Sequence, residues 1–207
     1  RRFQLRDRFG DIPRSRMKNP QLLADLVSVA AFAAKMNERA KALGLQNTFF
    51  VNPHGLPSTT DEDPFSTARD LAMIAKTADK LPDIRKIVKL QSYKFAKPDG
   101  KFIDLANTNR VLRTASYCDG MKTGFTKEAG YNLVGSAVQN GLRLIVVVAG
   151  AKNDKERADE ARKLIEWGFK GFESRLLFAE GQTVADAKVY GGEKGSVALT
   201  GKGPIRL

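Results

Sequence analysis

Three adjacent residues, Lys122-Thr123-Gly124, have the side chains and the spacing to bind an anionic group. The Lys122 ammonium and the Thr123 hydroxyl can both hold a carboxylate, and Gly124 leaves room for a ligand backbone to lie close to the chain. So short a motif equally fits a polar edge strand with a turn glycine. Its chemistry therefore depends on the elements that position it.

The residues that follow the triplet predict a β-hairpin. Apolar and polar residues alternate from Tyr131 to Val138, and a second apolar run extends from Leu142 to Ala149 after Asn140-Gly141. Asn-Gly between two apolar runs is the strongest short hairpin signal. We therefore expect Lys122-Thr123-Gly124 to lie on the first arm of this hairpin, and hence on a sheet.

Longer stretches carry a resemblance to one protein family. Lys-Thr-Gly is the third motif of penicillin-binding proteins, after a Ser-x-x-Lys nucleophile and a Ser-x-Asn type element. The run from Asp119 to Ala137 resembles the D-alanyl-D-alanine carboxypeptidases, the low-molecular-mass penicillin-binding proteins that trim peptidoglycan peptides. Further matching blocks occur in the family's order between about Ala30 and Leu177: Met36-Asn37, Ala42 to Leu45, Asn52 to Pro57, Ser66 to Leu71, and Leu164 to Phe172.

The resemblance implies a serine acyl-enzyme mechanism. In that family a serine attacks the carbonyl between two D-alanines, a nearby lysine takes its proton, and backbone amides stabilise the oxyanion. The resemblance implies that Lys122 and Thr123 hold the terminal carboxylate and that Gly124 lets the substrate lie along the strand. It also implies one oxyanion hydrogen bond from the backbone amide of Phe125. The expected partners are peptidoglycan stems ending in D-Ala-D-Ala and the β-lactams that mimic them, with no cofactor.

The nucleophile is less clearly marked. Residues Pro13 to Lys18 fit Pro-x-Ser-x-x-Lys, with Ser15 and Lys18 one helical turn apart. Against this pair, fewer than twenty residues separate it from Met36-Asn37, where the family has several dozen, and no Ser-x-Asn triplet occurs. Two hypotheses therefore stand: an incomplete or divergent serine D-Ala-D-Ala carboxypeptidase, or a non-catalytic homologue that retains the Lys-Thr-Gly strand as a wall-binding module.

The fold expected from both pattern and resemblance is α+β, an antiparallel sheet with flanking helices of the β-lactamase and transpeptidase type. Apolar periodicity predicts helices within Pro20 to Leu43, from Ser66 to Leu81, over Asp83 to Val88 and from Asp154 to Trp167. Lys89 to Ala96 and Lys101 to Ala106 predict a second hairpin. We expect an unassigned basic segment in 1–18, a partial catalytic domain in 19–178 and the beginning of a C-terminal β domain in 179–207.

Charge and composition limit the partners. The net charge is +12, but the basic residues are interspersed with acids, aromatics are few and no nucleic-acid motif occurs, so no nucleic-acid partner is expected. Anionic lipid head groups or the anionic wall remain alternatives to a simply solvated basic surface. The sequence contains no apolar run of membrane-spanning length and no signal peptide. The resemblance implies a periplasmic or wall-facing location.

Several single residues carry two interpretations each. His54 is the only histidine and Cys118 the only cysteine, so a metal site is not expected and His54 is interpreted as ordering its loop. Asn107 to Arg110 resembles a family segment near the active-site cleft, although its polar residues could equally cap a turn. Arg157 stands where the family usually has an arginine, and a solvated helix charge is the alternative. Thr67 and Asp70 predict a capping box.

Overall fold

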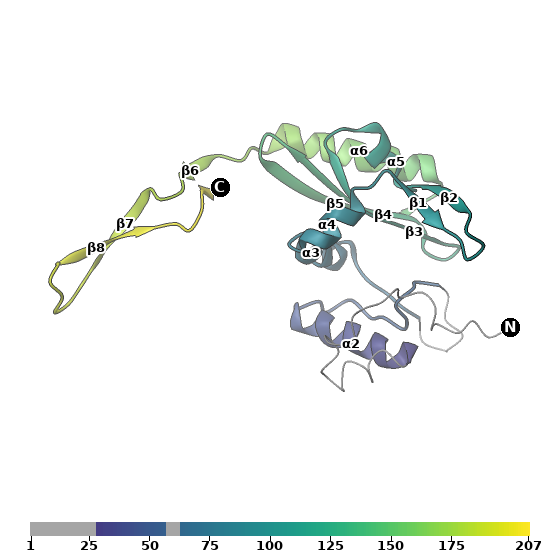
Figure 1. Ribbon diagram of the computed structural model, residues 1–207, viewed down its shortest axis with the longest axis horizontal. Coiled ribbons are helices and arrows are strands. Elements are labelled where there is room, and N and C mark those ends of the chain that lie inside the picture. The colour runs from purple at the N-terminus through teal and green to yellow at the C-terminus, as the bar shows by residue number, and fades with distance from the viewer. Residues whose placement is uncertain (1–27, 57–62) are drawn as a thin grey trace.

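The strand that carries Lys122 is the edge of a three-stranded antiparallel sheet in the computed structural model, which describes residues 28–56 and 63–207. Within these ranges β3 (Cys118–Thr126), β4 (Gly130–Gln139) and β5 (Leu142–Ala151) lie in the order β3-β4-β5 (Figure 1). Because one side of β3 pairs with β4, its outward backbone amides are open to other partners. The expected antiparallel sheet is confirmed, but Lys122-Thr123-Gly124 lies on β3, the strand that precedes the β4–β5 hairpin, and not on the first arm of that hairpin.

The turn between β4 and β5 has the predicted chemistry. Gln139 pairs with Leu142, so Asn140 and Gly141 alone form the turn, with φ of 50° and 79°. Positive φ at both central residues is the requirement of a type I′ turn, whose twist matches that of the strands. Asn140-Gly141 therefore fixes the register of the β4–β5 pair.

Helices cover both faces of the sheet. On one face α6 (Asp154–Gly171) packs on β4 and β5, and the short α5 (Arg110–Thr114) contacts α6 and β3. On the other face α3 (Ala68–Ala78) packs on β5 and β4, and α4 (Pro82–Val88) packs on β3 (Figure 1). The sheet is therefore the middle layer of three.

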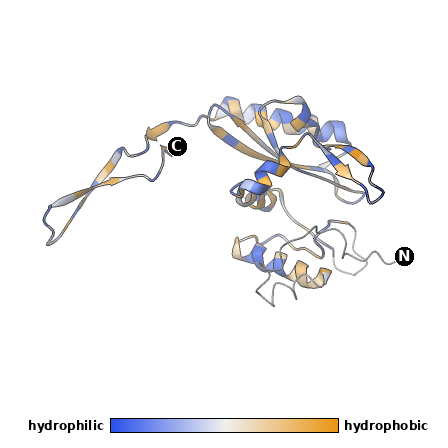
Figure 2. Ribbon diagram, in the orientation of Figure 1, coloured by the Kyte–Doolittle hydropathy of each residue, from blue (hydrophilic) through white to orange (hydrophobic). Residues whose placement is uncertain are grey.

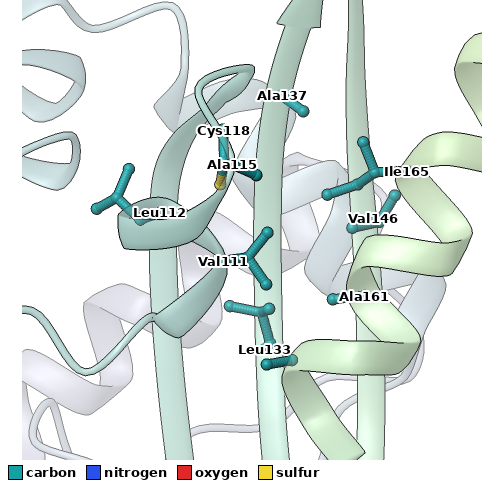
Figure 3. Packing of buried hydrophobic residues seen from close by; sticks show 10 residues of the cluster. Val111, Leu112, Ala115, Cys118, Leu133, Ala137, Val146, Ala161 and Ile165 are labelled. Atoms are coloured by element: carbon teal, nitrogen blue, oxygen red, sulfur yellow. The ribbon is translucent and has the colours of Figure 1, made fainter. Parts of the chain in front are cut away.

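The core lies between α6, α5 and the sheet (Figure 3). Ile165 and Ala161 of α6 are fully buried, because the apolar residues of this helix recur on the side that faces β4 and β5. A Cβ added at Gly168 would lie 2.7 Å from Leu144 Cδ1, so the glycine permits close helix-to-sheet packing. The buried cluster comprises Val111, Leu112, Ala115, Cys118, Leu133, Ala137, Val146, Ala158, Ala161 and Ile165.

The N-terminal helix of the described part is α2 (Val29–Ala42), which begins after the N-cap Ser28. The part of the predicted helix that precedes Ser28 lies outside the described residues, as does the basic segment. Asn37 joins α2 to the next segment, since its side chain donates to the Phe50 carbonyl and accepts from the Phe50 amide, both at 2.7 Å. After α2 the chain forms one isolated antiparallel β-bridge, between Phe49 and Phe65.

The predicted capping box at α3 is half correct. Thr67 accepts from the Asp70 amide at 3.2 Å, but the Asp70 carboxylate does not reach back to its own cap. It accepts instead from the Asn47 amide at 3.0 Å and the Thr48 hydroxyl at 2.8 Å. Through these two hydrogen bonds the buried Asp70 connects the loop after α2 to the start of α3.

His54 orders its loop as expected. Its Nδ1 atom accepts from the Leu56 amide at 3.2 Å, and its own amide donates to Asn52 Oδ1 at 3.2 Å. The described residues contain no group of three or more metal-ligating side chains.

The remaining strands form two-stranded ladders. The predicted hairpin of β1 (Ser92–Ala96) and β2 (Phe102–Ala106) is present. After α6, β6 (Leu176–Phe178) pairs with β9 (Ile205–Arg206), and β7 (Thr183–Lys188) pairs with β8 (Ser196–Thr200). These C-terminal strands extend away from the sheet, and Figure 2 shows apolar residues along them. The proposed domain boundaries stay predictions. No helix in 28–56 or 63–207 is long and apolar enough to cross a membrane.

Candidate functional site

A hollow of about 600 Å³ lies beside the edge strand β3. This volume is within the usual range of small-ligand sites, about 300–1,000 Å³. Segments from β3, β4, α6 and the β2–α5 connection meet here; the lining residues are Ala106, Asn107, Thr108, Arg113, Lys122, Thr123, Gly124, Phe125, Tyr131, Asp154 and Arg157. All four residues predicted from the sequence on β3 are thus brought to one site, whereas Ser15 and Lys18 lie outside the described residues.

The turn before α5 holds β3 in place from its outer side. Asn109 is buried, and its side chain donates to the Gly120 carbonyl at 3.1 Å while accepting from the amides of Val111 and Leu112. One asparagine therefore caps α5 and anchors the strand at the same time. The capping interpretation of this segment is correct for Asn109, and Asn107 and Thr108 of the same segment line the hollow.

Thr108 contacts the Lys-Thr-Gly triplet directly. Its hydroxyl lies 2.7 Å from the hydroxyl of Thr123, and either oxygen can be the donor. Because each hydroxyl has one proton and two acceptor sites, the pair still has a proton and lone pairs for a ligand. The sequence pointed to the Asn107 to Arg110 segment but not to Thr108 itself. The contact joins residues fifteen positions apart, and no local sequence pattern predicts it.

Gly124 faces open space. A Cβ built at this position meets no protein atom within 4 Å, so the glycine is not needed for internal packing. The aromatic residues Phe125 and Tyr131 both line the hollow, and their ring centroids are 4.3 Å apart. A ligand that lies along β3 at Gly124 would therefore meet an aromatic wall at the next residue.

Arg157 is a buried part of the site wall and not a solvated helix charge. Its guanidinium donates to the Asp154 carboxylate, to the Thr108 carbonyl at 3.4 Å and to the Asn132 carbonyl at 3.5 Å. It also lies 5.6 Å from the Tyr131 ring centroid. These contacts join α6, β4 and the α5 turn, so Arg157 fixes the relative position of three elements of the site.

An ion network supports β3 from the opposite face of the sheet. Arg143 on β5 binds the Asp119 carboxylate with both terminal nitrogens, at 2.8 and 3.0 Å, and donates to the Ser136 hydroxyl at 2.6 Å. Its Nε atom lies 3.4 Å from Asp79, which also pairs with Arg85 of α4 at 3.4 Å. The network thus connects the end of α3, and α4, to the strand three residues before Lys122.

The ionisation of Asp119 reflects this network. Desolvation, the largest single effect, raises the pKa of Asp119, but hydrogen bonds from Arg143 and Ser136 and the charges of Arg143 and Arg85 together hold the pKa below its usual value of 3.8. The hydrogen bond to Asp119 raises the pKa of Arg143 in turn. The pair is therefore ionised throughout the neutral range.

Cys118 does not qualify as a nucleophile. Burial raises the pKa of its thiol, which donates to the Gly120 carbonyl at 3.3 Å inside the core. A reactive cysteine requires an accessible, readily formed thiolate. Cys118 is therefore a packing residue.

The sequence matches one protein family over most of its length. The family profile of peptidase S11, D-alanyl-D-alanine carboxypeptidase, matches residues 23–153. The D-alanyl-D-alanine carboxypeptidase DacF of Bacillus subtilis is 41% identical over 177 residues, which are 85% of this chain and 44% of that protein. DacC of Escherichia coli is 42% identical over 181 residues, 86% of this chain and 43% of that protein. The chain thus spans less than half the length of these relatives.

Solved structures give the same result for the fold. Penicillin binding protein 5 from Haemophilus influenzae superposes with a TM-score of 0.72 at 38% identity, over 89% of this chain and 53% of that chain. The Streptomyces K15 DD-transpeptidase gives a TM-score of 0.61 at 33% identity, over 68% of this chain and 54% of that chain. The expected α+β fold of the transpeptidase type is confirmed, and the chain belongs to the S11 peptidase family of D-alanyl-D-alanine carboxypeptidases.

Proposed function

We propose that this protein acts in peptidoglycan maturation as a serine-type D-Ala-D-Ala carboxypeptidase that β-lactams acylate. The observation that carries the proposal is the combination of Lys122, Thr123 and the open Gly124 on an edge strand beside a hollow of about 600 Å³. In this arrangement the ammonium and the hydroxyl bind the terminal carboxylate of the stem peptide, and the peptide backbone lies against Gly124. The backbone amide of Phe125 donates to the oxyanion.

The relatives support an enzyme over a non-catalytic wall-binding module, because those compared above are named as carboxypeptidases or as a transpeptidase. The substrate is a wall component, so the proposed place of action is the periplasm or the wall-facing side of the membrane. The Ser15 and Lys18 pair is the proposed nucleophile and base, as the pair that fits Pro-x-Ser-x-x-Lys.

The test is intact mass spectrometry of the polypeptide after incubation with benzylpenicillin. A penicilloyl mass increase that is lost in Ser15→Ala would establish acylation and identify the nucleophile. An increase that persists in Ser15→Ala would keep the acyl-enzyme mechanism and refute Ser15. No increase in any sample would refute acylation by this polypeptide.

Ligand binding is tested separately, so that the hollow is examined even where acylation fails. An acetylated peptide ending in D-Ala-D-Ala is titrated calorimetrically into the wild type, Lys122→Ala and the matched control Lys127→Ala. Lys127 is exposed in the turn after β3 and does not line the hollow. Binding that is lost in Lys122→Ala and kept in Lys127→Ala supports the proposed carboxylate site, whereas equal binding by both variants refutes it.

A further inference from the structure

We propose that Arg113 makes this site selective for peptides that carry a second carboxylate next to the C-terminal D-Ala-D-Ala. The inference rests on the function proposed above and names a class of stem peptide for it. Three cations, Arg113, Lys122 and Arg157, line the hollow together with one anion, Asp154.

The charge of Arg157 is already neutralised within the protein. Arg157 pairs with Asp154 and donates to the carbonyls of Thr108 and Asn132, and its side chain is only 7% exposed. Asp154 is also bound by Arg110 at 3.4 Å from outside the hollow. The single anion of the lining is therefore neutralised, and the donors of Arg157 are used within the protein.

The other two cations have no anionic partner among the described residues. Lys122 Nζ donates to the backbone carbonyl of Thr123, a neutral group. The Arg113 side chain makes no hydrogen bond or ion pair with any residue of 28–56 or 63–207, although it lines the same hollow. The site therefore presents two uncompensated positive charges, on β3 and on the last turn of α5.

A monocarboxylate can neutralise only one of these charges. If Lys122 and Thr123 bind the terminal carboxylate, Arg113 stays unpaired beside the ligand. A guanidinium offers two parallel N–H donors that match a carboxylate, so a second carboxylate on the ligand is its complementary group. A peptide whose side chain upstream of D-Ala-D-Ala ends in a carboxylate therefore satisfies both cations at once.

A competing structural role for Arg113 is the stabilisation of the C-terminal end of α5 by its positive charge. That role predicts an effect of substitution on thermal stability and none on ligand preference. Selectivity between two matched ligands therefore distinguishes the roles.

The experiment compares two acetylated peptides, Glu-D-Ala-D-Ala and Gln-D-Ala-D-Ala, which differ by one carboxylate. Their affinities are measured by calorimetry for the wild type, Arg113→Gln, Arg113→Lys and the control Arg175→Gln. Arg175 is remote from the hollow, so this control removes the same charge elsewhere. We expect the wild type to bind the Glu peptide about two- to fivefold more tightly, as for an exposed charge pair, because the Arg113 side chain is exposed.

Arg113→Gln should abolish this preference, so that the variant binds the Glu and Gln peptides with equal affinity. Arg113→Lys should retain part of the preference and Arg175→Gln all of it. Equal affinity of the wild type for both peptides, or a preference that survives Arg113→Gln, would overturn the inference and leave the proposed function intact. Failure of the wild type to bind either peptide would refute both.

Discussion

Removal of Arg143 should destabilise the protein through the carboxylates that this guanidinium neutralises. In Arg143→Met the Asp119 carboxylate loses two hydrogen bonds at 2.8 and 3.0 Å, and Asp79 loses a cation at 3.4 Å. Arg85 remains near Asp79 and compensates part of the loss. The damage is therefore centred on Asp119, at the beginning of the strand that carries Lys122.

The expected loss in the free energy of unfolding depends on how exposed the Arg143–Asp119 ion pair is. Exposed ion pairs contribute about 0.2–1 kcal/mol, whereas breaking a buried ion pair costs about 3–5 kcal/mol. The side chains of Arg143 and Asp119 are 23% and 27% exposed, between these limits. Their bidentate geometry places them toward the stronger end. We expect Arg143→Met to lower the free energy of unfolding by about 2–4 kcal/mol and the coupling between the two residues to be about 1–3 kcal/mol.

The assay is a double-mutant cycle of Arg143→Met and Asp119→Asn by urea unfolding. The matched control is the Glu173 and Arg175 pair, whose side chains are 77% and 73% exposed and should show no measurable coupling. Calorimetry with the D-Ala-D-Ala peptide provides a second measurement, since a displaced β3 should weaken binding at Lys122.

The stability difference between wild type and Arg143→Met should change with pH in a defined direction. The pKa of Asp119 is lower in the folded protein than its usual 3.8, so its contribution is complete above 3.8 and is lost as the pH falls through the lowered value. The difference in stability between wild type and Arg143→Met should therefore narrow as the pH falls below 3.8. A coupling of zero at neutral pH, or a difference that widens in acid, would refute this account of the network.

Three further substitutions test ligand binding and folding separately. Gly124→Ala should leave the urea midpoint unchanged, because the added Cβ meets no protein atom, but should weaken peptide binding. Gly130→Ala should destabilise the folded protein, because φ is 67° and the added Cβ would lie 3.0 Å from the Ala151 carbonyl oxygen. Equal binding by Gly124→Ala and wild type would contradict the view that a ligand lies along β3. Asn109→Ala should cost about 2–4 kcal/mol in urea unfolding, since it leaves the Gly120 carbonyl and two helix amides without their buried partner; a loss below about 0.5 kcal/mol would show that water replaces the amide.

Local patterns predicted the elements of this fold well. Asn140-Gly141 predicted the hairpin, because Asn-Gly readily adopts the positive φ that both central residues of this turn have in the structure. The apolar periodicity of Asp154 to Trp167 likewise predicted α6, although the helix extends four residues further, to Gly171. Each of these signals is contained within a few residues, so one sequence is sufficient to interpret it.

Contacts between distant residues were not predictable in the same way. Arg157 lies among alternating charges on α6, and its sequence context does not distinguish a solvated arginine from a buried one with three acceptors. Asp70 matches a capping box, yet its carboxylate binds groups more than twenty residues earlier in the chain. Both outcomes depend on which segment the tertiary fold places beside the helix.

The length of α6 sets a distance scale for the ligands of this protein. Asp154 at its first residue lines the hollow, and the C-terminal strands begin after its last residue, Gly171. A helix of 18 residues is about 27 Å long at 1.5 Å per residue. A tripeptide in extended conformation reaches only about 10 Å. A single short peptide bound in the hollow therefore cannot reach these strands, and a molecule that contacts both must be longer than about 27 Å.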